Sequence, residues 1–325
     1  MGKLTMGNKM LRFAMLLGAA LFSSRAFALS CTFGVSNMNF GSVDTLSSSQ
    51  INTTATLSMD CSGGLVGQQI LLCAHFAAGS GGASTATARQ MLSGANSLNY
   101  QLYSDSARSI IWGSYAWAYA SRPPAIRLTL GLLGTATGTA TIYGSVFGGQ
   151  GTVPPGTYLS TFSGAYVEYR YRVTNANNCS TANSTTLAPA STFTINATVA
   201  ANCLVSTGNI DFGSTGVLAA NLDATGQVSI TCTPATSYTL SLNGGTTGSP
   251  PATRKMSKGA ETLTYGLYKD IARTQPWGDA STPGSMVTGT GTGAPQSLTV
   301  YGRVPPQATP SAGVYTDTVV VTVTY

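Results

Sequence analysis

Apolar and polar residues alternate along much of the chain, with the two-residue period of a half-buried β-strand. Leu98, Tyr100 and Leu102 share one face of such a segment, and the last eight residues read T-V-V-V-T-V-T-Y, from 318 to 325. Short runs of this kind are separated by Gly, Pro, Ser and Asn turns, and helical periodicity is nearly absent. The pattern predicts an all-β chain built from β-sandwiches.

The chain holds two copies of one pattern. Residues 89–113 read R-Q-M-L-S-G-A-N-S-L-N-Y-Q-L-Y-S-D-S-A-R-S-I-I-W-G, and residues 254–278 read R-K-M-S-K-G-A-E-T-L-T-Y-G-L-Y-K-D-I-A-R-T-Q-P-W-G, at a constant offset of 165. Cys31 and Cys203 each stand nine residues before a Phe-Gly pair. A long-range repeat indicates a duplicated unit. It predicts a domain over 29–174, a linker over 175–202 and a second domain over 203–325.

The chain has six cysteines, and an even number in an exported chain favours disulfides. In the two copies, the second cysteine follows the first by 30 and 29 residues, so these are paired with each other. Two further cysteines have no counterpart in the second copy and are paired by elimination. The predicted bridges are Cys31–Cys61, Cys203–Cys232 and Cys73–Cys179. The cysteines lack C-x-x-C spacing and the only histidine is His75, so a metal site is disfavoured.

The first 28 residues have the layout of a signal peptide. Lys3, Lys9 and Arg12 precede an apolar stretch over 13–22, and A-F-A at 26–28 is a small-x-small cleavage site. A short membrane anchor is the alternative, although the apolar stretch has only about half of the ~20 residues that a span needs. Cleavage after Ala28 leaves 325 − 28 = 297 residues of an exported mature protein.

Charge excludes some function classes. The net charge is +6, and removing the four cations of the leader leaves 6 − 4 = +2, without a basic stripe for nucleic acid. The ten acidic residues are scattered and no nucleophile or phosphate-binding motif is present, so an enzyme is not expected and no cofactor is implied. Asp105 with Arg108, and Asp270 with Arg273, are expected to be structural ion pairs.

Several motifs together resemble a known family. They are the Cys…Phe-Gly starts, L-T-Y-G-L-Y-K-D at 263–270 followed by W-G, Y-G-R-V-P at 301–305 and A-G-V-Y-T-D at 312–317. In this order and spacing they resemble the spore coat protein U domain, which builds subunits of archaic chaperone–usher pili (sigma-fimbriae). The resemblance is close over 203–325 and looser over 31–173.

The resemblance implies tandem immunoglobulin-like sandwiches, of which the C-terminal one lacks its last strand. In this family a periplasmic chaperone fills the gap first, and the N-terminal extension of the next subunit later replaces it. An adjacent pilin subunit is therefore an implied partner. An outer-membrane usher is also an implied partner. The expected acceptor edge is Val319, Val321, Val323 and Tyr325 at the end of the chain.

The segment 191–202 reads S-T-F-T-I-N-A-T-V-A-A-N and alternates like a strand. It lies directly before Cys203, where pilins of the family carry their donor strand. We expect it to complete the first domain in cis; the alternative is an ordinary first strand of the second domain. The donor positions are Phe193, Ile195, Ala197 and Val199.

The copies differ in apolar loop segments, and two-domain members of the family are tip adhesins with an N-terminal binding domain. By resemblance, the first domain would bind an abiotic or host surface, mediating attachment and biofilm formation at the cell surface. An ordinary core-facing strand is the alternative for the Tyr-rich segment 115–119. The candidate residues are Leu65, Val66, Ile110, Ile111, Tyr115, Trp117, Tyr119, Phe147 and Val153.

A pilus shaft or coat subunit is the rival function. A shaft subunit must donate a strand of about ten residues, whereas cleavage after Ala28 would leave only Leu29 and Ser30 before Cys31. The expectation is therefore a subunit that accepts a strand and donates none, at the pilus tip.

Overall fold

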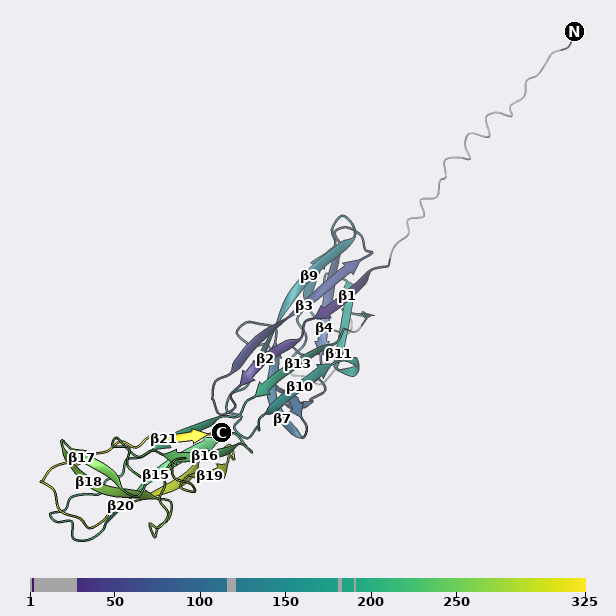
Figure 1. The fold of residues 1–325 in the computed structure, drawn as a ribbon. Coiled ribbons are helices and arrows are strands. Elements are labelled where there is room, and N and C mark those ends of the chain that lie inside the picture. The colour runs from purple at the N-terminus through teal and green to yellow at the C-terminus, as the bar shows by residue number, and fades with distance from the viewer. Residues whose placement is uncertain (1, 3–27, 116–120, 181–182, 190) are drawn as a thin grey trace.

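Two β-sandwiches lie end to end in the computed structural model of the chain (Figure 1). The structure describes residues 2, 28–115, 121–180, 183–189 and 191–325. The expected signal peptide lies almost wholly outside these residues, and so do Trp117 and Tyr119 of the candidate binding loop. No helix among the described residues is both long and apolar enough to cross a bilayer.

Domain 1 packs a large sheet against a four-stranded one. The large sheet runs β1-β3-β9-β7-β6-β10-β13-β2, with β5 paired to β6, and the small sheet runs β12-β11-β4-β8. The strands of the large sheet are β1 (Ser30–Val35), β2 (Met38–Val43), β3 (Ile51–Ser62), β5 (Ala83–Thr85), β6 (Ala88–Ser93), β7 (Asn96–Tyr103), β9 (Thr135–Val146), β10 (Gly156–Phe162) and β13 (Phe193–Val199). The small sheet holds β4 (Gln69–Phe76), β8 (Ile126–Thr129), β11 (Val167–Val173) and β12 (Thr186–Leu187), and a 3-10 turn, η1 (Gly164–Tyr166), precedes β11.

Domain 2 repeats this plan with fewer strands. One sheet runs β14-β15-β20-β18-β17 and the other runs β19-β16-β21. The first sheet holds β14 (Cys203–Thr207), β15 (Leu222–Cys232), β17 (Arg254–Lys258), β18 (Glu261–Tyr268) and β20 (Gln296–Val304). The second holds β16 (Ser237–Leu242), β19 (Val287–Thr290) and β21 (Val321–Thr324). The all-β fold of two tandem sandwiches predicted from the alternation is confirmed.

Inward-facing residues of both sheets form a separate core in each domain. The alternating positions Leu98, Tyr100 and Leu102 of β7 are all buried, as their two-residue period predicts. Their repeats Leu263 and Tyr265 of β18 are buried in the second core. The repeated motif is therefore chiefly a core-forming motif.

All three predicted disulfides are present. Cys31–Cys61 and Cys203–Cys232 each join residues directly opposite one another on neighbouring strands, β1 with β3 and β14 with β15. Cys73–Cys179 fastens the segment that follows β11 to the outer face of β4. This third bridge closes over a separation of 106 residues and has no equivalent in domain 2.

The repeated Asp and Arg do not pair with each other, which corrects the expected ion pairs. Asp105 accepts hydrogen bonds from the backbone amides of Ser109 and Ile110, so it closes the turn after β7. Arg108 instead donates from Nε to the carbonyl of Gly144 on β9. Asp105 thus stabilises the turn, because its carboxylate accepts hydrogen bonds from backbone amides that would otherwise lack an acceptor.

Each domain contains a fully buried arginine, Arg89 in domain 1 and Arg254 in domain 2. Arg254 is fully buried and donates hydrogen bonds to the carbonyls of Leu242, Asn243, Pro251 and Trp277. Burial lowers the pKa of Arg254, but a guanidinium is not deprotonated in proteins and Arg254 stays charged. It therefore ties β16, the turn after it and the segment after β18 to β17.

We predict that Arg254→Met lowers the free energy of unfolding of domain 2 by about 3 kcal/mol, because it leaves buried carbonyls without a donor. Denaturant unfolding followed by hydrogen–deuterium exchange would locate the loss in domain 2. Lys255→Met on the same strand, where the side chain is exposed, is the matched control. Equal stability of the two variants would contradict this assignment.

Candidate functional site

Strand β13 fills a position in the large sheet of domain 1, between β10 and β2. It pairs antiparallel with β10 and parallel with β2. The four expected donor positions, Phe193, Ile195, Ala197 and Val199, are all buried in the core of domain 1. The ring of Phe193 stacks on that of Phe162, with centroids 4.6 Å apart. The segment before Cys203 therefore belongs structurally to the preceding domain.

In domain 2, the segment 313–319 corresponds to β10. Tyr158 of β10 donates its hydroxyl hydrogen to the carbonyl four residues earlier, and Tyr315 does the same. Leu159 of β10 bridges to Leu92 of β6, and Thr316 bridges in the same way to Ser257 of β17. On the side of β17, the segment 313–319 thus has the partner that β10 has in β6, although the segment is not itself a strand.

The segment 209–213 corresponds to β2. In β2, Asn39 Oδ1 accepts a hydrogen bond of 2.7 Å from the amide of Gly41, and Asp211 Oδ1 accepts one of 2.8 Å from Gly213. Both glycines have left-handed φ values, 69° and 73°. The same turn therefore lies on the other side of the strand position that β13 occupies in domain 1.

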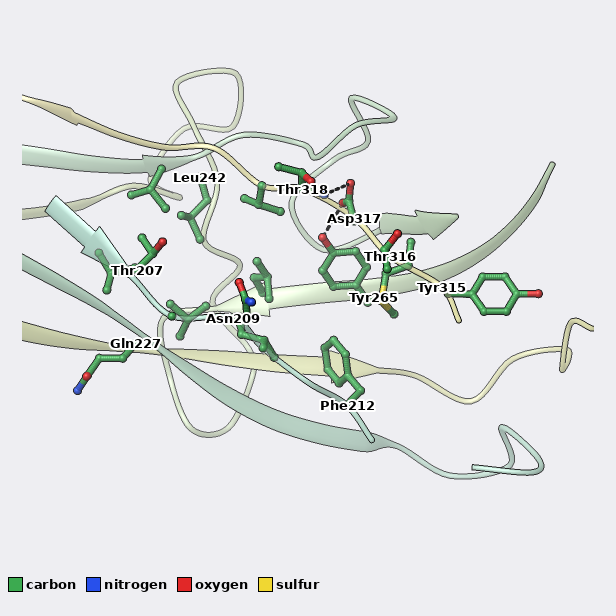
Figure 2. Close-up of a pocket in the computed structure, with 18 residues that line it drawn as sticks. Thr207, Asn209, Phe212, Gln227, Leu242, Tyr265, Tyr315, Thr316, Asp317 and Thr318 are labelled. Carbon is green, nitrogen blue, oxygen red and sulfur yellow. Dashed lines mark hydrogen bonds between the residues drawn. The ribbon is translucent and has the colours of Figure 1, made fainter. Parts of the chain in front are cut away.

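No strand of the described chain occupies that position in domain 2, and a groove of about 530 Å³ lies there. Figure 2 shows Asn209 and Phe212 along one wall and Tyr315 to Thr318 along the other, with Tyr265 between them. The further lining residues are Thr207, Gly208, Ile210, Gln227, Val228, Leu242, Met256, Leu267, Val300, Val319 and Val321. The groove therefore mixes apolar and polar side chains, and it is open where domain 1 is filled.

Asp317 is the carboxylate among the residues that line the groove. Its carboxylate accepts hydrogen bonds from the Tyr265 hydroxyl at 2.6 Å, from the amide and hydroxyl of Thr246 at 2.8 and 2.7 Å, and from the amide of Thr318 at 2.8 Å. Burial disfavours its charge, but these hydrogen bonds outweigh burial and hold the pKa of Asp317 below its usual range. Burial and the bond to Asp317 raise the pKa of the Tyr265 phenol. Asp317 is therefore an anion at neutral pH.

The expected acceptor edge lies only partly in the groove. Val319 and Val321 line it, whereas Val323 packs against the core of domain 2, farther along β21. Tyr325 is 55% exposed, and its hydroxyl bonds Asn202 at 3.3 Å. Sequence reasoning missed the groove walls at 208–213 and 315–318. The repeated Phe-Gly pair and the repeated G-x-Y at 156–158 and 313–315 were the available signals.

The structure separates the expected adhesive residues. Leu65 and Val66 lie beyond the end of the β3–β9 pair at Ser62 and Thr135, whereas Phe147 directly follows its other end. Twelve paired positions at ~3.3 Å per residue put these ends about 36 Å apart. Val153 is only 7% exposed and belongs to the core, which corrects its expected place on an exposed loop.

The described neighbours of the aromatic loop lie elsewhere on domain 1. Ile111 bridges to Tyr103, the last residue of β7, and Ile110 beside it is exposed. Tyr115 is half-buried, packs edge-on against His75 and bonds Ser184. Its place is closer to the core-facing alternative than to an exposed loop. Whether Trp117 and Tyr119 bind a surface stays a prediction, because both lie outside the described residues.

His75 is a buried histidine on β4 of domain 1. Burial, together with the nearby charges of Arg170 and Arg122, lowers the pKa of His75 to about 3, so the ring is neutral. Its Nδ1 lies 3.2 Å from the hydroxyl of Ser114. The described residues contain no group of three or more His, Cys, Asp or Glu side chains that could hold a metal ion.

Two leucines that the sequence reasoning missed join Leu65 and Val66 at the far end of domain 1. The β3–β4 and β8–β9 loops are joined by hydrogen bonds from Gly63 to Gly134 and from Gly67 to Leu130. They carry four strongly exposed apolar side chains: Leu65 (71%), Val66 (61%), Leu132 (93%) and Leu133 (89%). We call these four residues the apical patch. Its sequence signal was L-G-L-L-G at 130–134, an apolar run punctuated by glycines.

We predict that Phe193→Ala destabilises domain 1 by about 3–5 kcal/mol and leaves domain 2 unchanged, because it empties a packed aromatic site. Hydrogen–deuterium exchange should show lost protection in β10 and β2. Thr198→Ala, an exposed position on the same strand, is the control. Loss of protection in domain 2 instead would contradict the placement of β13.

Comparisons with known proteins agree with this architecture. The chain is 34% identical over 132 residues to Protein U of Myxococcus xanthus, covering 36% of this chain and 72% of that protein. Its fold is similar to a chain in the crystal structure of the CsuC-CsuE chaperone-tip adhesion subunit pre-assembly complex from archaic chaperone-usher Csu pili of Acinetobacter baumannii. That similarity has a TM-score of 0.50 at 17% identity and covers 91% of this chain and 100% of the other.

The sequence model of the Spore Coat Protein U domain matches residues 18–164 and 189–322, most of the chain. The second match begins before Cys203 and so takes in β13, although that strand lies in the sheet of domain 1. The resemblance drawn from the repeated motifs is confirmed, and the chain belongs to the Spore Coat Protein U domain family.

Proposed function

We propose that this protein is the tip adhesin of a chaperone–usher pilus, in which domain 2 accepts a donor strand and domain 1 makes the adhesive contact. One observation carries the proposal: the strand position that β13 fills in domain 1 is an open groove in domain 2. The chain is thus complete at one domain and open at the other. It has no catalytic role in this proposal.

The open groove needs a strand from another chain. Segment 313–319 bridges to β17 at Thr316, no described strand pairs with it on the groove side, and Val319, Val321 and Leu242 line the groove there. Unpaired edges and exposed apolar side chains make such a domain prone to association. β-strand addition satisfies both needs at once. A periplasmic chaperone would fill the groove first, and an adjacent subunit would replace it at an outer-membrane usher. The fold shared with a chain of the chaperone-tip adhesion subunit pre-assembly complex supports a chaperone-bound stage before assembly.

In the same proposal, β13 is the donor strand that completes domain 1 in cis. It makes domain 1 independent of the chaperone, so only domain 2 has to be capped during export through the periplasm. The polar segment 175–189 and the Cys73–Cys179 bridge lead the chain from β11 to β13.

The apical patch supports an adhesive role for domain 1. Monomeric proteins rarely expose a contiguous apolar cluster without a partner. Figure 1 shows the β3–β9 end of domain 1 pointing away from domain 2, where a subunit bound at the groove would lie. The patch carries no charged side chain, so we propose that it attaches the cell to apolar surfaces and promotes biofilm formation there.

We predict that Leu132→Asp with Leu133→Asp reduces attachment to alkyl-coated beads by about tenfold or more. Burying one leucine side chain contributes about 1.5–3 kcal/mol, and tenfold corresponds to about 1.4 kcal/mol. Bead retention in flow would measure the loss. Ile271→Asp is the control, because Ile271 is an exposed apolar residue of domain 2. Unchanged retention would reject the apical patch, and joint removal of Tyr115, Trp117 and Tyr119 would then test the aromatic loop.

The position in the fibre is a separate question with a direct test. Immunogold labelling of assembled pili with an antibody against domain 1 should label the ends only. Label along the fibre would favour the rival reading, a shaft or coat subunit, and would contradict the tip assignment.

A further inference from the structure

We propose that Asp317 makes the groove of domain 2 reject β13 of this chain and accept donor strands with a hydrogen-bonding side chain at the matching position. The inference rests on the proposed function, because it takes the groove to be a donor-strand acceptor. Asp317 would then decide which donor strands the groove binds.

Domain 1 supplies the register of a filled groove. In the β10–β13 pair, Ser160 stands directly opposite Ile195. Both side chains are buried on the same face of the sheet. Directly opposed residues of an antiparallel pair have Cβ atoms about 4.5–5.5 Å apart, so each decides what fits at the other.

Asp317 stands at the Ser160 position of domain 2. Each lies two residues after the tyrosine that bonds the carbonyl four residues earlier. Each also contacts the same turn, since a Cβ at either Gly79 or Gly245, both left-handed, would collide with the Ser160 or Asp317 side chain. An incoming strand in the β13 register would therefore place its Ile195 equivalent against Asp317.

The two oxygens of Asp317 are unequally satisfied. Oδ1 accepts hydrogen bonds from the amide and hydroxyl of Thr246 and from the amide of Thr318, whereas Oδ2 accepts one, from the Tyr265 hydroxyl. A carboxylate oxygen offers about two acceptor sites, so Oδ2 needs another donor when water is displaced. Figure 2 shows Tyr265 reaching this carboxylate from the middle of the groove.

An isoleucine side chain cannot give that hydrogen bond. Covering Asp317 with it would remove water from an anion without replacement, which is costly. A threonine, serine or asparagine could donate to Oδ2. In domain 1, the neutral hydroxyl of Ser160 is compatible with Ile195, so the same strand is accepted there.

At the aromatic end of β13, domain 2 offers smaller side chains than domain 1. Phe193 packs against Phe76 and Phe162 in domain 1, with ring centroids 5.2 and 4.6 Å away. The matching positions in domain 2 are Leu242, whose carbonyl is bound by the buried arginine as that of Phe76 is, and Val319. Rejection of its own strand would keep copies of the chain from joining through β13, a specificity built by repulsion as well as attraction.

The test is peptide binding to the full chain. Two labelled peptides of residues 191–202 carry Ile195→Thr or Ile195→Val, which differ by one hydroxyl in place of a methyl. Fluorescence anisotropy should show the Thr peptide binding about tenfold more tightly than the Val peptide, and Asp317→Ser should abolish or reverse this preference. Asp317→Asn, which keeps the size, should weaken it.

The outcomes separate the two proposals. Equal binding of both peptides to the wild-type groove overturns the role of Asp317 but leaves the acceptor groove standing. Failure of both peptides to bind wild-type and variant chains overturns the acceptor function and this inference together.

A reciprocal variant keeps the test independent of folding in domain 2. Ser160→Asp should strip hydrogen–deuterium exchange protection from β13, because it places the same anion opposite Ile195. Ser160→Thr is the control and should retain that protection. Full protection of β13 in Ser160→Asp would overturn the inference.

Discussion

The need of a β-strand for a partner on each side governs this molecule. In domain 1 the need is met internally, because the chain continues past β11 and returns as β13 between β10 and β2. In domain 2 the same two walls are present but nothing described lies between them. The buried arginine and tryptophan of each repeat hold the rest of the sandwich in place without that strand. A domain that is folded yet short of one strand follows from this division.

The sequence predicted the parts of this structure that depend on spacing. Alternation in β7 and β18, the repeat offset and the cysteine intervals were enough for the fold and the three disulfides. The exposed patch was only half predicted, because Leu132 and Leu133 become a surface through hydrogen bonds between two loops 60 and more residues apart in sequence. Val153 looked like a loop residue among glycines and prolines, but it packs into the core. Periodicity predicts which residues share a face of a strand, but it does not predict which loops contact each other.

The groove is a second feature that sequence periodicity alone does not predict. Its walls, 208–213 and 313–319, are not strands in domain 2, although exposed and half-buried positions alternate along much of both. Their counterparts in domain 1 are β2 and β10, which become strands beside β13. Strand character there depends on a neighbour that pairs with them, and a single sequence does not display that dependence. The two domains together reveal this dependence, because domain 1 has the walls with their partner strand and domain 2 has the same walls without it.

A duplicated domain also sets a problem of recognition. Two homologous strand positions in one chain invite the same strand, and a protein that joins others through such a position gains from making them different. The walls differ where β13 is most demanding: rings at Phe76 and Phe162 give way to Leu242 and Val319, and a hydroxyl at Ser160 gives way to the carboxylate of Asp317. Apolar contacts alone discriminate weakly between strands of similar shape, whereas an anion that must keep a hydrogen-bond donor discriminates strongly. The carboxylate of Asp317 is therefore the group in the groove that can separate the two domains most strongly.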